Sequence, residues 1–128
     1  NLKKIILPSN LLLENYLFKS EILFKNIQTK ISNISKDSRI AIWGTGSHTS
    51  RLLGMTKIQN INIIKFYDSD TKRHRFKILN KLITSFDVSD IDKGLVDTII
   101  ISTFSGEKAI LKYLSSLNIE IKIVSFYD

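Results

Sequence analysis

Two short stretches of the chain carry residues whose types and spacing suit binding of a phosphorylated ligand. The first is an apolar run, Arg39–Trp43, that breaks into Gly44-Thr45-Gly46-Ser47 before apolar residues resume at helical spacing. This pattern predicts a buried strand that turns sharply into a helix N-terminus, where backbone N–H groups collect around an anion. The second stretch ends at Asp68, 22 positions after Gly46. Dinucleotide-binding folds place a carboxylate at about this spacing against a ribose hydroxyl.

The residues of the glycine-rich turn have distinct expected roles. Gly44 is expected to allow the tight turn, and Gly46 to let the backbone approach a phosphate without an intervening Cβ. Thr49 stands at the third position of the glycine fingerprint, where its β-branched side chain would push the helix away from the strand. Ser47, His48 and Thr49 fall in the first helical turn, where side chains cap the helix or reach a phosphate. For His48, capping or exposure, ligand contact and acid–base catalysis all stay open.

The acidic and basic residues after the second strand bear on which nucleotide is bound. Asp68 suits an unphosphorylated ribose and would repel the 2′-phosphate of NADP. The basic run Lys72-Arg-His-Arg75 follows at once. It either offsets this repulsion or forms a solvated loop, and the second interpretation is favoured.

Small polar residues follow each of the more regular predicted strands. Because the carboxyl ends of parallel strands share one edge of the sheet, these residues are expected to converge on a nucleotide-sized polar ligand. The alternative is that they are there because strand ends need turn residues. The predicted binding residues are Gly44, Thr45, Gly46, Ser47, His48, Thr49, Asp68, Asp70, Ser102, Thr103 and Ser105.

Catalytic motifs are nearly absent from the sequence. It contains no Tyr-x-x-x-Lys pair, no Gly-x-Ser-x-Gly elbow, no phosphate-binding Walker motif and no histidine pair at metal-ligand spacing. Glu107 could act as a base, but its place in a helical first turn is already explained by the helix dipole. No catalytic residue and no metal ligand is therefore predicted, and whether the protein is an enzyme stays open.

The elements that must position these residues follow from apolar periodicity. A long amphipathic helix is predicted over about 10–34, with Ser32–Ser38 as a connector. Short β-branched runs then predict strands at about 39–43, 61–67, 82–84, 97–103 and 121–126, and helices at about 48–57, 87–93 and 106–117. With right-handed crossovers this is an α/β fold with a Rossmann-like parallel sheet of order 3-2-1-4-5. Residues 1–38 thus form the helix and connector, and residues 39–128 the nucleotide-binding domain.

The apolar stripe of the 10–34 helix is broader than one face of a small sheet requires. The helix either packs on its own domain or forms an interface with a partner domain or a second copy of the chain. These two interpretations are equally favoured.

Composition limits the other function classes. No apolar run is long enough to span a bilayer and no signal-peptide pattern is present, so a cytoplasmic location is expected. The net charge of +7 is spread along the chain, with six basic and three acidic residues in 1–38 and thirteen and nine in 39–128, which argues against a nucleic-acid partner. With no cysteine there is no disulfide or thiolate site. Because the chain begins at Asn1 without Met, we expect it to be part of a longer protein.

Three strings carry a family resemblance: Ile-Trp-Gly-Thr-Gly-Ser-His at 42–48, Tyr-Asp-Ser-Asp at 67–70, and Asp-Thr-Ile-Ile-Ile-Ser-Thr at 97–103. Residues 39–128 resemble the small Rossmann-like modules of bacterial surface-polysaccharide and sugar-modification proteins. These include the nucleotide-sugar-binding N-terminal domains of sugar acetyltransferases and the C-terminal domains of sugar C-methyltransferases. The resemblance implies that Gly44, Gly46, Ser47 and His48 form the glycine-rich turn, and that Asp68 and Asp70 form the acidic end of the second strand.

The leading functional hypothesis is a noncatalytic module that binds a nucleotide or nucleotide-sugar, with nucleotide-sugar or NAD as the expected ligand. One alternative is a fragment of an NAD-dependent sugar-nucleotide oxidoreductase or epimerase, with its catalytic residues elsewhere. A second alternative is a structural interaction domain without a ligand.

Overall fold

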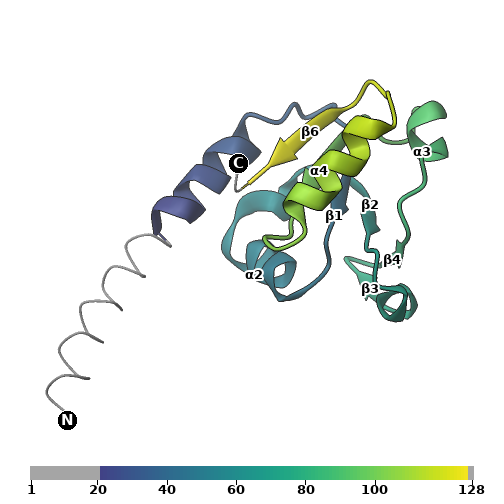
Figure 1. Ribbon diagram of the computed structural model, residues 1–128. Coiled ribbons are helices and arrows are strands. Elements are labelled where there is room, and N and C mark those ends of the chain that lie inside the picture. Colours follow the sequence, from purple (N-terminus) through teal and green to yellow (C-terminus); the bar gives the residue numbers. More distant parts are fainter. Residues whose placement is uncertain (1–20, 127–128) are drawn as a thin grey trace, which may run out of the picture.

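The computed structural model describes residues 21–126, which form a mixed α/β domain built on one six-stranded sheet (Figure 1). The strand order is β3-β4-β2-β1-β5-β6, and all neighbours are parallel except β3 and β4. An N-terminal helix over 21–32 precedes the sheet. The remaining elements are β1 (Ile40–Trp43), α2 (Ser47–Met55), the 3-10 helix η1 (Lys57–Asn60), β2 (Ile63–Tyr67), the 3-10 helix η2 (Thr71–Arg75), β3 (Lys77–Ile78), β4 (Lys81–Thr84), α3 (Ser89–Asp92), β5 (Thr98–Ile101), α4 (Glu107–Ser116) and β6 (Lys122–Ser125).

The central strands are apolar on both faces because both faces are covered. All four residues of β1 are buried, and so are all four of β5. Side chains alternate along a strand, so Ile40 and Ile42 enter one hydrophobic cluster while Ala41 and Trp43 enter the other. The continuous apolar runs of the sequence therefore correspond to strands in the middle of a three-layer domain.

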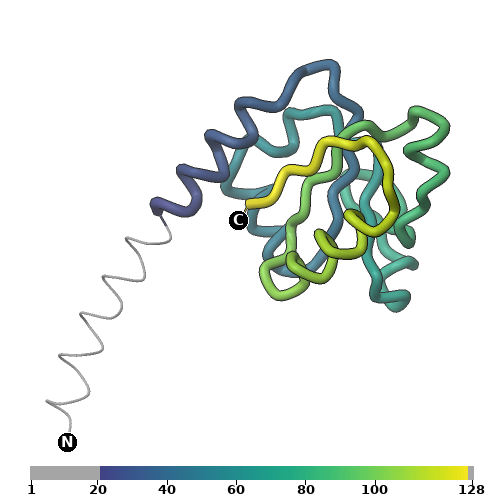
Figure 2. Tube along the Cα trace, turned by 45° about the horizontal axis from the view of Figure 1, so that its top comes forward, coloured from purple at the N-terminus to yellow at the C-terminus, as the bar shows by residue number. Residues whose placement is uncertain are grey.

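Each cluster is completed by different helices. The first contains Ile27 and Ile31 of the N-terminal helix and Leu52 of α2, whereas the second contains Leu114 of α4. Strand β6 runs between the N-terminal helix and α4 (Figure 1). Figure 2 shows the same strand in yellow from a second direction. Consistent with this, the Lys30 ammonium group donates a hydrogen bond to the carbonyl oxygen of Ser125.

The α/β class and the mostly parallel sheet confirm the sequence prediction, but the strand order differs from 3-2-1-4-5. The difference is β3, an additional two-residue antiparallel strand at the edge of the sheet. It forms because Leu79 and Asn80 adopt positive φ values of 49° and 63°, so the chain turns back on itself within two residues. Sequence reasoning missed this hairpin because Leu-Asn is not a typical turn pair of this kind.

The N-terminal helix lies only partly within the described residues. The predicted segment 10–20 is outside them, and the helix ends at residue 32 rather than 34. Over 21–32 it packs on its own domain, with Ile27 fully buried. An interface through residues 10–34 stays a prediction. No helix among residues 21–126 is long and apolar enough to cross a membrane.

Packing of the N-terminal helix can be tested with two isoleucines on opposite sides of it. Ile27 is fully buried and Ile22 is 43% exposed. We expect Ile27→Ala to lower the free energy of unfolding by about 2–5 kcal/mol, since it opens a cavity in the core. Ile22→Ala should change it by less than about 0.5 kcal/mol. Urea unfolding followed by circular dichroism measures both, and equal effects would contradict the packing described here.

Candidate functional site

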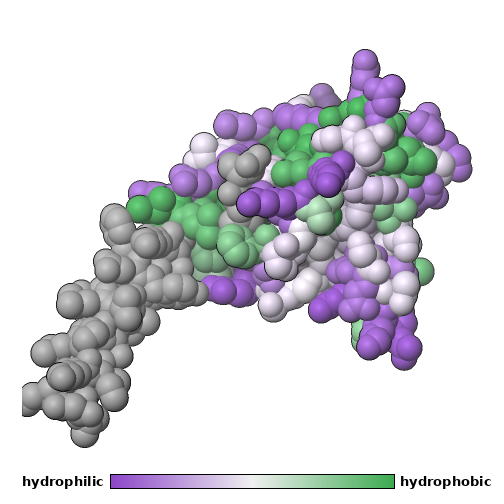
Figure 3. Space-filling model, viewed as in Figure 1, coloured by the Kyte–Doolittle hydropathy of each residue, from purple (hydrophilic) through white to green (hydrophobic). Residues whose placement is uncertain are grey.

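A cleft of about 550 Å³ lies at the carboxyl ends of β1 and β5. Strand β1 lies between β2 and β5 in the sheet. From β1 the chain first adds strands on the β2 side and later adds β5 and β6 on the other side, so the strand order reverses at β1. The glycine-rich turn after β1 forms one wall, and residues 102–106 after β5 form another. In Figure 3 the corresponding lower edge of the domain, between α2 and β3, is mainly white to purple, so residues of intermediate to hydrophilic character predominate there.

Gly44 is the residue of the turn that must be glycine. Its φ is +115°, and a Cβ added there would lie 3.0 Å from the carbonyl oxygen of Ser102. Gly46, by contrast, has a φ of −78° and is the N-cap of α2. A Cβ at Gly46 would meet only the Arg73 guanidinium, at 3.9 Å. The turn therefore depends on Gly44 for its conformation, whereas Gly46 leaves open space toward the cleft.

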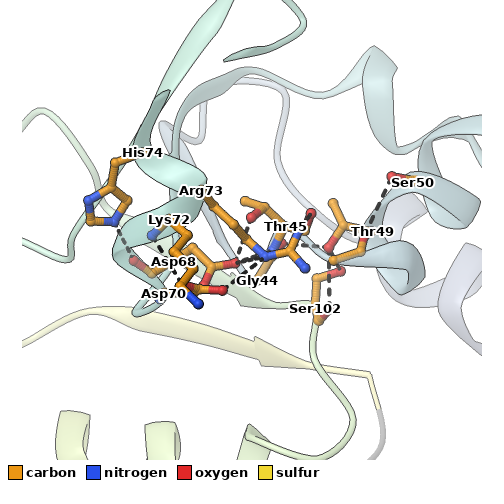
Figure 4. Close-up of polar contacts among 11 residues, drawn as sticks. Gly44, Thr45, Thr49, Ser50, Asp68, Asp70, Lys72, Arg73, His74 and Ser102 are labelled. Atoms are coloured by element: carbon orange, nitrogen blue, oxygen red, sulfur yellow. Dashed lines mark hydrogen bonds and ion pairs between the residues drawn. The ribbon is translucent and has the colours of Figure 1, made fainter. Parts of the chain in front are cut away.

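The Asp68 carboxylate binds the glycine-rich turn directly (Figure 4). Its Oδ2 accepts hydrogen bonds from the Thr45 backbone N–H at 2.9 Å and from the Thr45 hydroxyl at 2.6 Å. Its Oδ1 accepts a third, from the Asp70 N–H at 2.9 Å. Burial raises the pKa of Asp68, but these hydrogen bonds and the Arg73 charge together lower it below its usual value. Asp68 lines the cleft, yet Oδ2 is already engaged by the turn and Oδ1 by the backbone of its own loop.

Arg73 of η2 reaches across the turn from the opposite side of the cleft. Its Nη1 donates to the Thr45 carbonyl oxygen at 3.2 Å, and its Nε lies 3.8 Å from carboxylate oxygens of both Asp68 and Asp70. Its side chain is 44% exposed, so the guanidinium is held in place but still accessible. Sequence reasoning favoured a solvated loop for 72–75 and missed this position. The available signal was Asp70, which caps η2 by accepting from the Lys72 N–H and so turns Arg73 toward the glycines.

Thr49 and Ser102 lie underneath the turn. The Thr49 hydroxyl donates to the carbonyl oxygen of Gly44 at 2.5 Å and lies 2.7 Å from the Ser102 hydroxyl. Thr49 is fully buried and Ser102 is 1% exposed. The prediction that Thr49 contacts a ligand is therefore corrected: it is not among the cleft residues, and its hydroxyl ties α2 to the turn. Ser102 reaches the cleft wall but uses its hydroxyl for the same contact.

The remaining predicted residues are divided between the cleft and its surroundings. Ser47, His48, Thr103 and Ser105 line the cleft. Asp70 is not a cleft-lining residue: its carboxylate caps η2 and lies 3.8 Å from the Arg73 Nε, so its part in ligand binding stays a prediction. Burial, and then the nearby positive charge of Arg51, lower the pKa of His48, so its imidazole is neutral at pH 7. A neutral imidazole carries one hydrogen-bond donor and one acceptor.

Two helix N-termini point at the cleft, and they differ in charge. The first turn of α2 contains no acidic residue, and no side chain caps its N-terminus. The first turn of α4 contains Glu107, which is 5% exposed and accepts a hydrogen bond from the Ser125 hydroxyl. The positive end of the α4 dipole thus already faces a carboxylate, and that of α2 is the one suited to an external anion. Within residues 21–126, no cluster of His, Asp or Glu is arranged to hold a metal ion.

The different conformational and steric requirements at Gly44 and Gly46 can be tested by substituting alanine at each position. Gly44→Ala should lower the free energy of unfolding by about 1–3 kcal/mol, because alanine is strained at φ +115° and its Cβ would crowd the Ser102 backbone. Gly46→Ala should cost less, since its φ of −78° suits alanine and its Cβ makes only an ordinary contact with Arg73 at 3.9 Å. Thermal unfolding by circular dichroism compares them. A larger loss at Gly46 would contradict the turn geometry.

The Asp68 carboxylate should make stability depend on acid pH. Because its pKa is lower in the folded state, its contribution is fully present above the usual Asp pKa of about 3.9 and is lost as pH falls below it. Asp68→Asn should therefore be less stable than the parent at pH 7, and the difference should shrink on titration toward pH 3. The exposed Asp37→Asn serves as the control and should show little difference at either pH. A constant Asp68→Asn effect across this range would refute the assignment.

Comparison with known proteins identifies a family but no function. Residues 36–124 match the family model described as C2185-like, N-terminal, a span that begins between the N-terminal helix and β1 and ends within β6. No curated protein and no solved structure matches the chain. Since the match covers most of the chain, and all of the sheet and cleft apart from the last residue of β6, the chain belongs to the C2185-like N-terminal family.

Proposed function

We propose that this domain is a noncatalytic Rossmann-like module that binds a nucleotide or nucleotide-sugar within a larger sugar-modification or surface-polysaccharide protein. The observation that carries the proposal is the placement of one accessible guanidinium, that of Arg73, over an uncapped helix N-terminus and a glycine-rich turn. A phosphate group seated there would receive backbone N–H donors from one side and a charged donor from the other.

The sheet supports the Rossmann-like part of the proposal. Its five parallel strands run in the order β4-β2-β1-β5-β6, and the cleft lies where connections diverge from β1. Ligands of open α/β sheets bind outside the carboxyl ends of the strands at such a point. The short strand β3 lies at the far edge of the sheet and does not alter this arrangement.

The state of Asp68 favours a phosphate over a ribose as the group that the turn recognises. A carboxylate that holds a ribose needs free acceptor sites, but Asp68 already accepts three hydrogen bonds and faces Arg73. This is the reason to place a nucleotide-sugar ahead of NAD. It also gives Asp68 a role without a ligand: it keeps Thr45, and with it the turn, in a phosphate-receiving conformation.

The cleft chemistry supports binding without catalysis. Among the described residues that line it, the ionisable side chains are His48, Asp68 and Arg73. Asp68 and Arg73 form a pair, and both also hold the turn. Of the three, His48 is the one whose side chain does not hold the turn, so it would have to supply acid–base chemistry by itself. A binding role uses all three residues as they stand.

Binding and its dependence on two positions provide the test. Thermal-shift and calorimetric titration with UDP-sugars, NAD, NADP, CoA and S-adenosylmethionine should identify a ligand that stabilises the domain. Gly46→Val should weaken that ligand by tenfold or more, at least about 1.4 kcal/mol, because it fills the space above the turn while keeping an allowed φ. No response to any of these compounds would favour a structural domain.

The role of Arg73 has a matched control in the same 3-10 helix. Arg73→Ala should weaken phosphate-containing ligands by about tenfold, since a charge-assisted hydrogen bond is lost. Arg75→Ala removes the same charge from an exposed residue outside the cleft and should have a much smaller effect. Isothermal titration calorimetry measures both affinities. If the two variants lose affinity equally, only net charge matters and the role assigned to Arg73 is wrong.

A further inference from the structure

Four aromatic rings form a cluster beside the cleft. Trp43 and Phe86 are stacked, with ring centroids 4.8 Å apart and an interplanar angle of 13°. Tyr67 meets both edge-on, at 6.0 Å from Trp43 and 5.4 Å from Phe86. Tyr113 of α4 also meets Trp43 and Phe86 edge-on, at 6.2 and 6.0 Å. The cluster thus connects the end of β1, the end of β2, the segment after β4 and the middle of α4.

The buried end of this cluster is held by a polar network. The Tyr67 hydroxyl donates to Asp90 Oδ2 at 2.6 Å, and the Lys65 ammonium group lies 3.0 Å from both oxygens of the same carboxylate. Burial, and then the hydrogen bond and negative charge of Asp90, raise the pKa of Tyr67, so the hydroxyl keeps its proton and remains a donor. Tyr67 therefore has one orientation, and the rings that pack against it are positioned before any ligand arrives.

The exposed end of the cluster lines a second hollow of about 430 Å³. This aromatic groove is formed by Trp43, Ser69, Ser85, Phe86, Ala109, Ile110 and Tyr113. Four of these residues, Trp43, Ser69, Ala109 and Ile110, also line the cleft at the glycine-rich turn. The two hollows are therefore neighbours on the same edge of the sheet, and one ligand can extend from the turn into the groove.

We propose that the aromatic groove receives the planar base of the nucleotide whose phosphate lies at the glycine-rich turn. The inference rests on the proposed function, because the turn supplies the phosphate end of the ligand. Tyr113 is 49% exposed and Phe86 is half-buried, so each offers ring surface to the groove. Bases stack on such rings through their π-faces, whatever their hydrogen-bonding edges.

The lining of the groove favours a base over the sugar end of a nucleotide-sugar. A sugar carries several hydroxyl groups around its ring, and each must find a hydrogen-bond partner when it is removed from water. The groove offers few: the hydroxyls of Ser69, Ser85 and Tyr113 and nearby backbone, while Trp43, Phe86, Ala109 and Ile110 are apolar. A planar base has polar groups only at its edge, so burying its two faces in these surroundings removes few hydrogen bonds to water. A sugar attached beyond the phosphate would then extend away from the groove.

A ligand series that keeps the phosphates and removes the base tests the inference. Trp43 is the only tryptophan of the chain and lines both hollows, so its fluorescence reports on the site directly. UDP and ADP should bind at least tenfold more tightly than inorganic pyrophosphate and should change Trp43 emission more strongly at saturation. Equal affinities of the nucleoside diphosphates and pyrophosphate would overturn the base subsite and leave the phosphate site standing. Absence of binding by all three would overturn the proposed function and the base subsite together.

Variants at Tyr113 separate stacking from hydrogen bonding. Tyr113→Ala should weaken UDP and ADP by about tenfold and leave pyrophosphate affinity unchanged, since pyrophosphate does not enter the groove. Tyr113→Phe keeps the ring and should bind nucleoside diphosphates nearly as the parent does. The exposed neighbour Lys112→Ala, which lines neither hollow, controls for changes in α4. Undiminished UDP and ADP binding by Tyr113→Ala would refute the stacking role.

Discussion

The interaction between the Asp68 carboxylate and Thr45 is the one on which the site depends. It joins the end of β2 to the turn after β1 through two hydrogen bonds to a single oxygen, beside a backbone bond from the Gly44 N–H to the Tyr67 carbonyl. Both strands therefore end at a common point, and the first turn of α2 starts from a defined direction. A carboxylate can do this because it accepts several hydrogen bonds at once and the paired Arg73 offsets its desolvation.

The turn is supported from below as well as from the side. Gly44 packs so close to the Ser102 backbone that a Cβ would crowd it, and the hydroxyls of Thr49 and Ser102 satisfy each other and the Gly44 carbonyl in a buried position. A β-branched residue at the third fingerprint position thus does not simply separate helix from strand. Its hydroxyl supplies a hydrogen bond that glycine or alanine lacks, which compensates for the added volume.

The two sides of the sheet contribute differently to the cleft. The side of α2 and the N-terminal helix is a mainly aliphatic core, rich in isoleucine. The side of α4 and α3 contains the aromatic cluster and the buried carboxylate of Asp90. Because successive residues of a strand face opposite sides, Trp43 at the end of β1 belongs to the aromatic side while the turn that follows it lines the cleft. A single strand end therefore adjoins both the cleft and the groove.

Sequence periodicity alone determined the fold class, the positions of the five parallel strands and the glycine-rich turn, because burial on both faces of a sheet leaves long apolar runs between polar strand ends. It also located Gly44, Thr45, Asp68 and residues 102–105 as neighbours. Which of these groups the protein itself engages follows from the tertiary structure. Asp68, Asp70, Thr49 and Ser102 are engaged by the protein itself, whereas Arg73, from a run that favoured a solvated loop, lies over the turn. Such assignments depend on hydrogen-bond geometry between residues far apart in the chain, which local spacing does not encode.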